Sequence, residues 1–149
     1  MADIVDLPAL LAQLQGFTPL QRVLLATAGT LQGTLSAYLG APVVVDVVSQ
    51  TVRGDSVHRE VALVCKEQDL VACRASTEIR VADERMRQLI IERSIGLGQI
   101  VALLGGSAQF ELDEVGDEPG EFWRRYRMWG DSFTYVITET FPKDLYAGP

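Results

Sequence analysis

The sequence contains few of the residues that bind metals or nucleic acids. It has one histidine and two cysteines, Cys65 and Cys73, and these show no metal-ligand spacing. Lysine and arginine together number 13 against 20 acidic residues, which gives a formal net charge of −7. A strongly negative protein is repelled by the phosphate backbone of DNA and RNA. We therefore expect neither a metal site nor a nucleic-acid partner.

Long apolar runs and targeting signals are also absent. No run of roughly 18 apolar residues occurs, so we expect no membrane-spanning segment. The N-terminal residues lack a basic region and include Asp3 and Asp6, which disfavours a signal peptide. Both cysteines fall in expected strands, where they are interpreted as small buried hydrophobic residues. Free, buried cysteines are consistent with a reducing compartment. These features together predict a cytoplasmic protein.

The remaining composition predicts one globular domain that spans residues 1–149. Hydrophobic residues make up 48% of the chain and charged residues 22%, which is ordinary for a folded protein. A chain of this length buries about 70% of its unfolded surface, which is enough for a real core.

The hydrophobic period changes along the chain and predicts the order of the elements. Helical spacing predicts helices over residues 7–15, 19–27, 30–40 and 82–94, and the glycine-bounded apolar stretch at residues 94–106 is interpreted as a tight turn followed by a short helix. Alternation predicts strands over residues 43–53, 58–67, 70–81, 108–115, 122–130 and 132–142, with an acidic loop at residues 117–120. Short connections between strands favour antiparallel pairing. We therefore predict an α+β fold, in which helices cover one face of a six-stranded antiparallel sheet.

One acidic residue falls on an apolar strand face. Residues of one parity in the last strand share a face, and they are Phe133, Tyr135, Ile137, Glu139 and Phe141. A lone carboxylate there is costly unless it is paired or functional. The simpler interpretation is an ion pair with an arginine of the preceding strand, namely Arg124, Arg125 or Arg127.

One basic residue shows the same anomaly. Arg59 shares its parity with Val57, Val61, Leu63 and Cys65. It could pair with Glu139 across the sheet. Alternatively, the two residues form the ends of a pocket for a small polar molecule with a carboxylate, which the planar guanidinium binds through two hydrogen bonds.

Two glycine-bounded positions offer backbone N–H groups. The helix over residues 30–40 begins after a break, with Thr30 as its expected cap, and an exposed helix N-terminus can bind an anion. In the GLG turn at residues 96–98, the Leu97 N–H either approaches a ligand or belongs to a simple packing turn.

Four segments, taken in this order, resemble the chorismate lyase family. They are GTLQGTLSAYLG (29–40), HREV (58–61), IGLGQI (95–100), and WRRYRM (123–128) followed by ITETFP (137–142). The resemblance implies a single antiparallel sheet with helices on one side, a ligand pocket sealed from solvent and no metal or organic cofactor. It also implies the conversion of chorismate to 4-hydroxybenzoate and pyruvate, by a monomer.

The resemblance further implies roles for individual residues. Arg59 would hold the ring carboxylate, with support from the backbone N–H groups of Leu31 and Leu97, and Glu139 would meet the 4-hydroxyl end of the ring. Two positions depart from the family pattern, since Leu31 stands where a methionine is typical and Gln99 where arginine or lysine is common. The candidates for a second cation, toward the enolpyruvyl carboxylate, are Arg74, Arg125 and Arg127, unless each pairs with a surface acid such as Glu78 or Glu121.

Two other classes of function remain open. Some bacterial transcription factors carry a non-catalytic ligand-sensing domain whose fold is similar to chorismate lyase, joined to a winged-helix DNA-binding half. The chain could also be an interaction protein in which Arg59 and Glu139 merely pair with each other. Pyruvate release from chorismate separates the enzyme from both.

Overall fold

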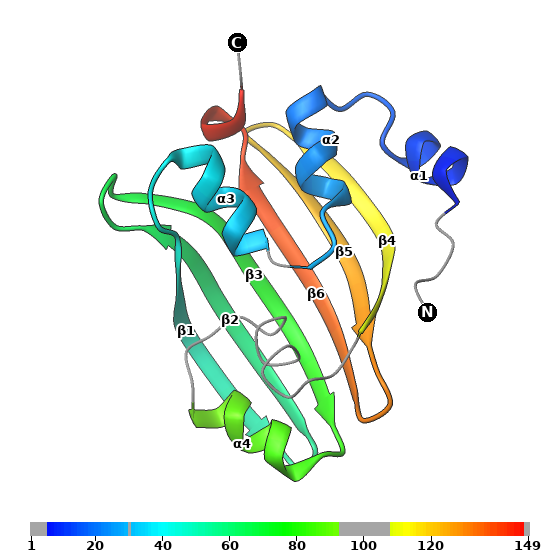
Figure 1. The fold of residues 1–149 in the computed structure, drawn as a ribbon, viewed down its shortest axis with the longest axis vertical. Helices are drawn as coiled ribbons and strands as arrows, with labels where there is room; N and C mark the ends of the chain where they lie inside the picture. The colour runs from blue at the N-terminus through cyan, green and yellow to red at the C-terminus, as the bar shows by residue number, and fades with distance from the viewer. Residues whose placement is uncertain (1–5, 30, 93–107, 148–149) are drawn as a thin grey trace.

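A single antiparallel sheet dominates the computed structural model, which describes residues 6–29, 31–92 and 108–147. Its six strands lie in the order β1-β2-β3-β6-β5-β4 (Figure 1). The strands are β1 (Val44–Arg53), β2 (Ser56–Cys65), β3 (Leu70–Val81), β4 (Gln109–Glu118), β5 (Glu121–Trp129) and β6 (Phe133–Pro142). Two three-stranded meanders therefore join through the central β3–β6 pair. The predicted α+β class with a six-stranded antiparallel sheet is confirmed.

Helices α2, α3 and α4 pack on one face of this sheet, which we call the inner face (Figure 1). The helical elements are α1 (Leu7–Gln13), α2 (Pro19–Ala26), α3 (Leu31–Leu39), α4 (Glu84–Glu92) and the 3₁₀ helix η1 (Asp144–Tyr146). Side-chain caps fix the starts of α1 and α2. Thr18 and Gln21 form a reciprocal capping box at α2, and Asp6 accepts a hydrogen bond from the Ala9 N–H at α1. Within the described ranges, no helix has both the length and the apolar character needed to cross a membrane.

The prediction of an acidic loop at residues 117–120 is wrong. Residues 117–120 were expected to form an acidic turn, but β4 continues through Asp117 to Glu118. Glu118 pairs with Glu121, so the connection to β5 is a tight turn that contains Gly120. Gly120 adopts a φ of 88°, which glycine tolerates without strain. The short helix expected within residues 94–106 lies outside the described residues.

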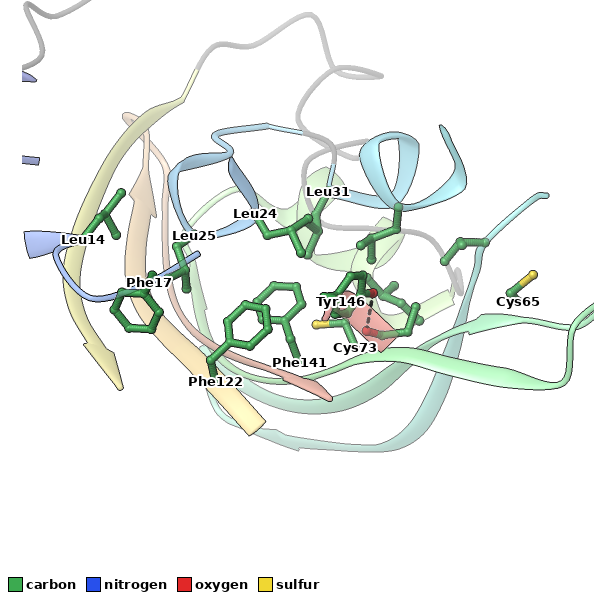
Figure 2. Packing of buried hydrophobic residues seen from close by; sticks show 14 residues of the cluster. Leu14, Phe17, Leu24, Leu25, Leu31, Cys65, Cys73, Phe122, Phe141 and Tyr146 are labelled. Carbon is green, nitrogen blue, oxygen red and sulfur yellow. Dashed lines mark hydrogen bonds between the residues drawn. The ribbon is translucent and has the colours of Figure 1, made fainter. Parts of the chain in front are cut away.

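Two hydrophobic clusters cover the inner face. The first core lies under α2 and α3, and its buried residues include Leu24, Leu25, Leu31, Leu35, Leu63, Cys65, Cys73, Phe122, Phe141 and Tyr146 (Figure 2). The second core lies under α4, and its buried residues include Val57, Ala75, Ile79, Met86, Ile90, Tyr126, Met128, Tyr135 and Ile137. Both cysteines are free and buried, as predicted.

Charged side chains mark the boundary between the two cores. Along β5, Arg124 lies between a residue of the first core and one of the second, and Glu139 occupies the same place on β6. On β2, Arg59 follows second-core Val57 and precedes first-core Leu63. We call the band that contains Arg59, Arg124 and Glu139 the polar seam. All three side chains are buried.

The C-terminal segment closes the first core. Tyr146 is completely buried, and its hydroxyl donates a 2.7 Å hydrogen bond to the Ala72 carbonyl (Figure 2). Ala72 lies on the part of β3 beyond Arg74, where the pairing with β6 ends. The Tyr146 ring also packs edge-on against Phe122 and Phe141. The tail therefore provides a hydrogen-bond donor for a carbonyl of β3 outside the pairing with β6, and its aromatic ring fills part of the first core.

We expect Tyr146→Phe to destabilise the protein by about 1–3 kcal/mol, because the buried Ala72 carbonyl loses its donor. Tyr38→Phe is the matched control, since its hydroxyl also donates to a carbonyl, that of Leu145, but in an exposed position. Water replaces that bond, so the control should change the stability by less than about 0.5 kcal/mol. Urea unfolding of both variants measures the difference, and equal losses would contradict this role for the tail.

Candidate functional site

Glu139 forms a buried ion pair with the strand next to it. Arg124 lies directly opposite Glu139 in the β5–β6 register, and its Nε donates to Glu139 Oε1 at 2.7 Å. The Tyr126 hydroxyl donates to Oε2 at 3.1 Å. The carboxylate is 6% exposed. The ion-pair interpretation of Glu139 is thus confirmed, with Arg124 as the partner.

Arg124 joins this pair to the end of α2. Its Nη1 donates to the carbonyl oxygens of Leu25 at 3.0 Å and Thr27 at 2.6 Å, which lie in the last turn of the helix and just beyond it. These carbonyls lack helical partners and carry the negative end of the helix dipole. The guanidinium also lies 4.4 Å from the centre of the Tyr126 ring. Arg124 therefore fixes a helix, an aromatic ring and the acid relative to one another.

Burial and charge shift the pKa values of Arg124 and Tyr126. Burial is the largest single effect on Arg124 and acts to lower its pKa, but the charge of Glu139, the hydrogen bond to it and the interactions with Tyr126 and Cys73 together raise the pKa. Burial and the same carboxylate raise the pKa of Tyr126 well above its ordinary value. Tyr126 therefore remains a hydrogen-bond donor. Its bond and that of Arg124 use two of the roughly four acceptor positions of a carboxylate, so Glu139 can also accept from a ligand hydroxyl.

Arg59 is held in a similar way at the end of α4. Its Nε donates to Gln50 Oε1 at 3.0 Å, and its Nη2 donates to the Ile90 carbonyl at 2.8 Å. Gln50 lies opposite Arg59 in the β1–β2 register and also donates to the Ile91 carbonyl at 3.3 Å. Gln50 and the Ile90 carbonyl are neutral acceptors. Burial lowers the pKa of Arg59. The predicted inward orientation of this cation is confirmed.

The two predicted charges lie in the same seam but do not form the salt bridge considered from the sequence. Arg59 pairs with Thr77 on β3, whereas Glu139 pairs with Ala75, one same-face position away. Two strand spacings, about 10 Å, separate β2 from β6. The salt bridge of Glu139 goes to Arg124 instead. Ala75 and Thr77, which lie between the two charges, are buried and small.

The two predicted backbone donors have different outcomes. Leu31 is buried at the first position of α3, and its N–H donates to the Gly29 carbonyl at 3.1 Å. A ligand carboxylate at this N–H would have to share it or displace that carbonyl. Leu97 lies outside the described residues, as do Thr30 and Gln99.

The arginines considered for a second carboxylate lie on the outer face. Arg74 is exposed. Arg125 pairs with Glu114, and Arg127 pairs with Glu111 and Asp113, all on the surface. The expected surface pairing of Arg125 and Arg127 is therefore confirmed, although with acids of β4 instead of Glu78 or Glu121.

Arg124 is the buried cation that the sequence analysis left unresolved. It was named only as one of three possible partners of Glu139. Alternation along β5 singles it out, since the buried residues are Phe122, Arg124, Tyr126 and Met128. The same alternation places Arg125 and Arg127 on the opposite face. The signal that distinguishes the three arginines was thus present in their own strand.

A second ionisable group lies on the outer face. His58 Nε2 lies 2.7 Å from Glu60 Oε1, and His58 Nδ1 contacts the Glu78 carboxylate. The Ser76 hydroxyl also donates to Glu60, at 2.8 Å. A surface depression of about 260 Å³ adjoins this group, lined by Thr51, Arg53, Ser56, His58 and Glu78. Each imidazole nitrogen already has a carboxylate partner, and among the described residues no cluster is suited to a metal ion.

This group makes stability depend on pH. The hydrogen bond to Glu78, and then that to Glu60, raises the pKa of His58 above its ordinary value of 6.5. The stabilisation is therefore fully present below pH 6.5 and is lost as the pH rises through the higher folded-state pKa. Because the pair is partly exposed, we expect at most about 1 kcal/mol.

The measurement is urea unfolding of the wild type and His58→Gln at several pH values. We expect the wild type to exceed the variant most below roughly pH 6.5, where the imidazole is protonated. Above that range the difference should shrink. A difference that stays constant from pH 5 to pH 9 would contradict the proposed linkage.

Comparison with models of known protein families finds no match for this sequence, and comparison with curated proteins finds none either.

Removal of the seam carboxylate should be strongly destabilising. Glu139→Gln leaves the buried Arg124 charge without its counter-charge, and we expect a loss of about 3–5 kcal/mol in the free energy of unfolding. The double variant Arg124→Met/Glu139→Leu removes both charges and should recover most of this loss. Urea unfolding of the single and double variants tests the pair, and an unchanged stability in Glu139→Gln would rule out a strong one.

Proposed function

We propose that the protein is a chorismate pyruvate-lyase, which converts chorismate to 4-hydroxybenzoate and pyruvate. The observation that carries the proposal is the polar seam itself. It contains a buried cation, Arg59, and a buried acid, Glu139, with the small residues Ala75 and Thr77 between them. These are the two charged residues to which the motif resemblance assigns the ring carboxylate and the ring hydroxyl. The fold class agrees with that of the family.

The reaction requires a protein site that orients chorismate and assists proton transfer. Chorismate loses the C4 hydrogen as a proton while the C3–O bond breaks, and the electron pair of that bond leaves with the enolpyruvyl oxygen. The ring becomes aromatic, which supplies the driving force, and the released enolate takes up a proton at its methylene carbon to give pyruvate. A site for this chemistry needs a carboxylate clamp and a polar or basic group at C4.

The seam supplies groups of both kinds in fixed positions. Arg59, oriented by Gln50 and the end of α4, would bind the ring carboxylate. Glu139, oriented by Arg124 and Tyr126, would accept the ring hydroxyl or the C4 proton. Hydrogen bonds that hold Arg59 and Glu139 in place in the free protein reduce the reorganisation of these side chains during the reaction.

The proposal predicts pyruvate release from chorismate, which coupling to lactate dehydrogenase and NADH oxidation measures. Arg59→Ala should lower kcat/KM by roughly a hundredfold or more, because a desolvated charge pair with the substrate is lost. Arg125→Ala, on the outer face, is the control and should keep the wild-type rate.

Because Arg59 also binds Gln50 and the end of α4, thermal melts must accompany these rates. Arg59→Lys keeps the charge but loses the planar two-bond geometry, and it should also be impaired. No pyruvate from the wild type, or a near-normal kcat/KM in folded Arg59→Ala, would refute the proposal.

A second candidate is a non-catalytic domain that binds aromatic carboxylates. The ion pair favours it, since a carboxylate whose charge is already balanced by Arg124 serves well as a fixed hydrogen-bond acceptor. This candidate predicts tight binding of 4-hydroxybenzoate without pyruvate release from chorismate. The same assay, combined with calorimetric titration of 4-hydroxybenzoate, separates the two.

A further inference from the structure

Tyr135 carries a buried hydroxyl that lacks a hydrogen-bond partner. Its side chain is completely buried on the inner face of β6, and no partner for its oxygen is present in the described structure. Almost all buried polar groups in folded proteins find a partner, so an exception suggests an acceptor that is absent from the free protein. The other buried tyrosines of the sheet region, Tyr126 and Tyr146, both donate to protein acceptors.

The register places Tyr135 next to Arg59 in the seam. Tyr135 pairs with Ile79 on β3, and Arg59 pairs with Thr77, so the two residues differ by one same-face position. Arg59 is tied to the Ile90 carbonyl, and Ile90 belongs to the same core as Tyr135. The guanidinium therefore lies at the Tyr135 end of the seam. Its electrostatic interaction with the Tyr135 hydroxyl supports this placement.

The hydroxyl is available as a donor at any ordinary pH. Burial raises the pKa of Tyr135, and the charge of Arg59 only partly opposes this effect. A neutral phenol beside a cation is arranged to donate toward a negative group. A carboxylate is suited to the place because it offers about four acceptor positions, of which a guanidinium uses two.

We propose that the Tyr135 hydroxyl donates a hydrogen bond to the ligand carboxylate bound by Arg59, so that the two residues together select small cyclic carboxylates. This inference rests on the proposed function, because it takes the carboxylate-binding role of Arg59 from it. It adds a residue that neither the sequence motifs nor the resemblance assigns to the site.

The inference also fixes the direction of the ligand. Tyr135 and Glu139 lie on the same face of β6, about 13 Å apart at 3.3 Å a residue. In this proposal a single ring lies between the two side chains. The carboxylate of the ring then lies at the Tyr135 and Arg59 end, and the hydroxyl lies at the Glu139 end. A ring without a carboxylate lacks the charged acceptor to which the Tyr135 hydroxyl would donate.

The test compares two buried tyrosines that differ only in whether the hydroxyl has a partner. Tyr135→Phe and Tyr146→Phe are titrated calorimetrically with benzoate, 4-hydroxybenzoate and phenol, and their melting temperatures are measured without ligand. We expect Tyr135→Phe to bind both carboxylates roughly 10- to 100-fold more weakly than the wild type, because a charge-assisted hydrogen bond is lost. Its melting temperature should be unchanged or higher, since a buried unpaired hydroxyl is removed.

The control should behave in the opposite way. Tyr146→Phe loses a satisfied hydrogen bond to the Ala72 carbonyl, outside the seam, so its melting temperature should fall while its benzoate affinity stays within about threefold of the wild type. Phenol should bind the wild type and Tyr135→Phe equally weakly. Wild-type benzoate affinity in Tyr135→Phe, or no benzoate binding by the wild-type protein, would overturn the inference.

These readouts separate this inference from the lyase proposal. Benzoate binding that depends on Tyr135, without pyruvate release from chorismate, supports the inference and refutes the lyase. Pyruvate release together with unchanged benzoate affinity in Tyr135→Phe supports the lyase and refutes the role of Tyr135. The two ideas therefore fail in different measurements.

Discussion

The buried ion pair between Arg124 and Glu139 is the interaction on which the rest of the structure depends. Arg124 is 1% exposed, and a charge so placed is tolerated only when its donors are satisfied. The acid of β6 and the carbonyls of Leu25 and Thr27 supply the acceptors. These contacts connect the β5–β6 hairpin to the end of α2. The register of the hairpin and the position of the helix are thus set by one guanidinium.

A common device positions both charged ends of the seam. Arg124 binds carbonyls at the end of α2, and Arg59 binds the Ile90 carbonyl in the last turn of α4. Carbonyls in the last turn of a helix lack intrahelical donors and carry the negative end of the dipole, so they attract cations. Each inward arginine therefore supplies hydrogen-bond donors to the C-terminal carbonyls of a helix that covers one of the two cores. The band where the two cores meet consequently becomes a row of fixed polar groups.

The alternation of residues along single strands predicted much of this arrangement. Features that depend on the pairing between strands could be recognised only in the structure. Parity placed Arg59 and Glu139 on the inner face, because a two-residue period is a property of one strand. Alternation along β5 likewise separates Arg124 from Arg125 and Arg127, and the register across the β5–β6 hairpin then places it opposite Glu139. The extension of β4 to Glu118 depends on its pairing with β5, and the insertion of Tyr146 into the first core depends on Ala72, which is distant in the sequence. The orphan hydroxyl of Tyr135 has no sequence signal, since its parity is that of an ordinary core residue.

The nature of the seam argues for a role beyond stability. A buried ion pair rarely stabilises a protein more than apolar side chains of similar volume would, because both charges lose their hydration. Apolar residues at 124 and 139 would merge the two cores into one and recover most of the stability that is lost when the acid alone is removed. What the charged pair offers instead is a carboxylate with fixed direction and spare acceptor positions, close to a second buried cation and an unpaired hydroxyl. An arrangement that forgoes stability in order to display polar groups inward is better explained by a ligand than by the fold.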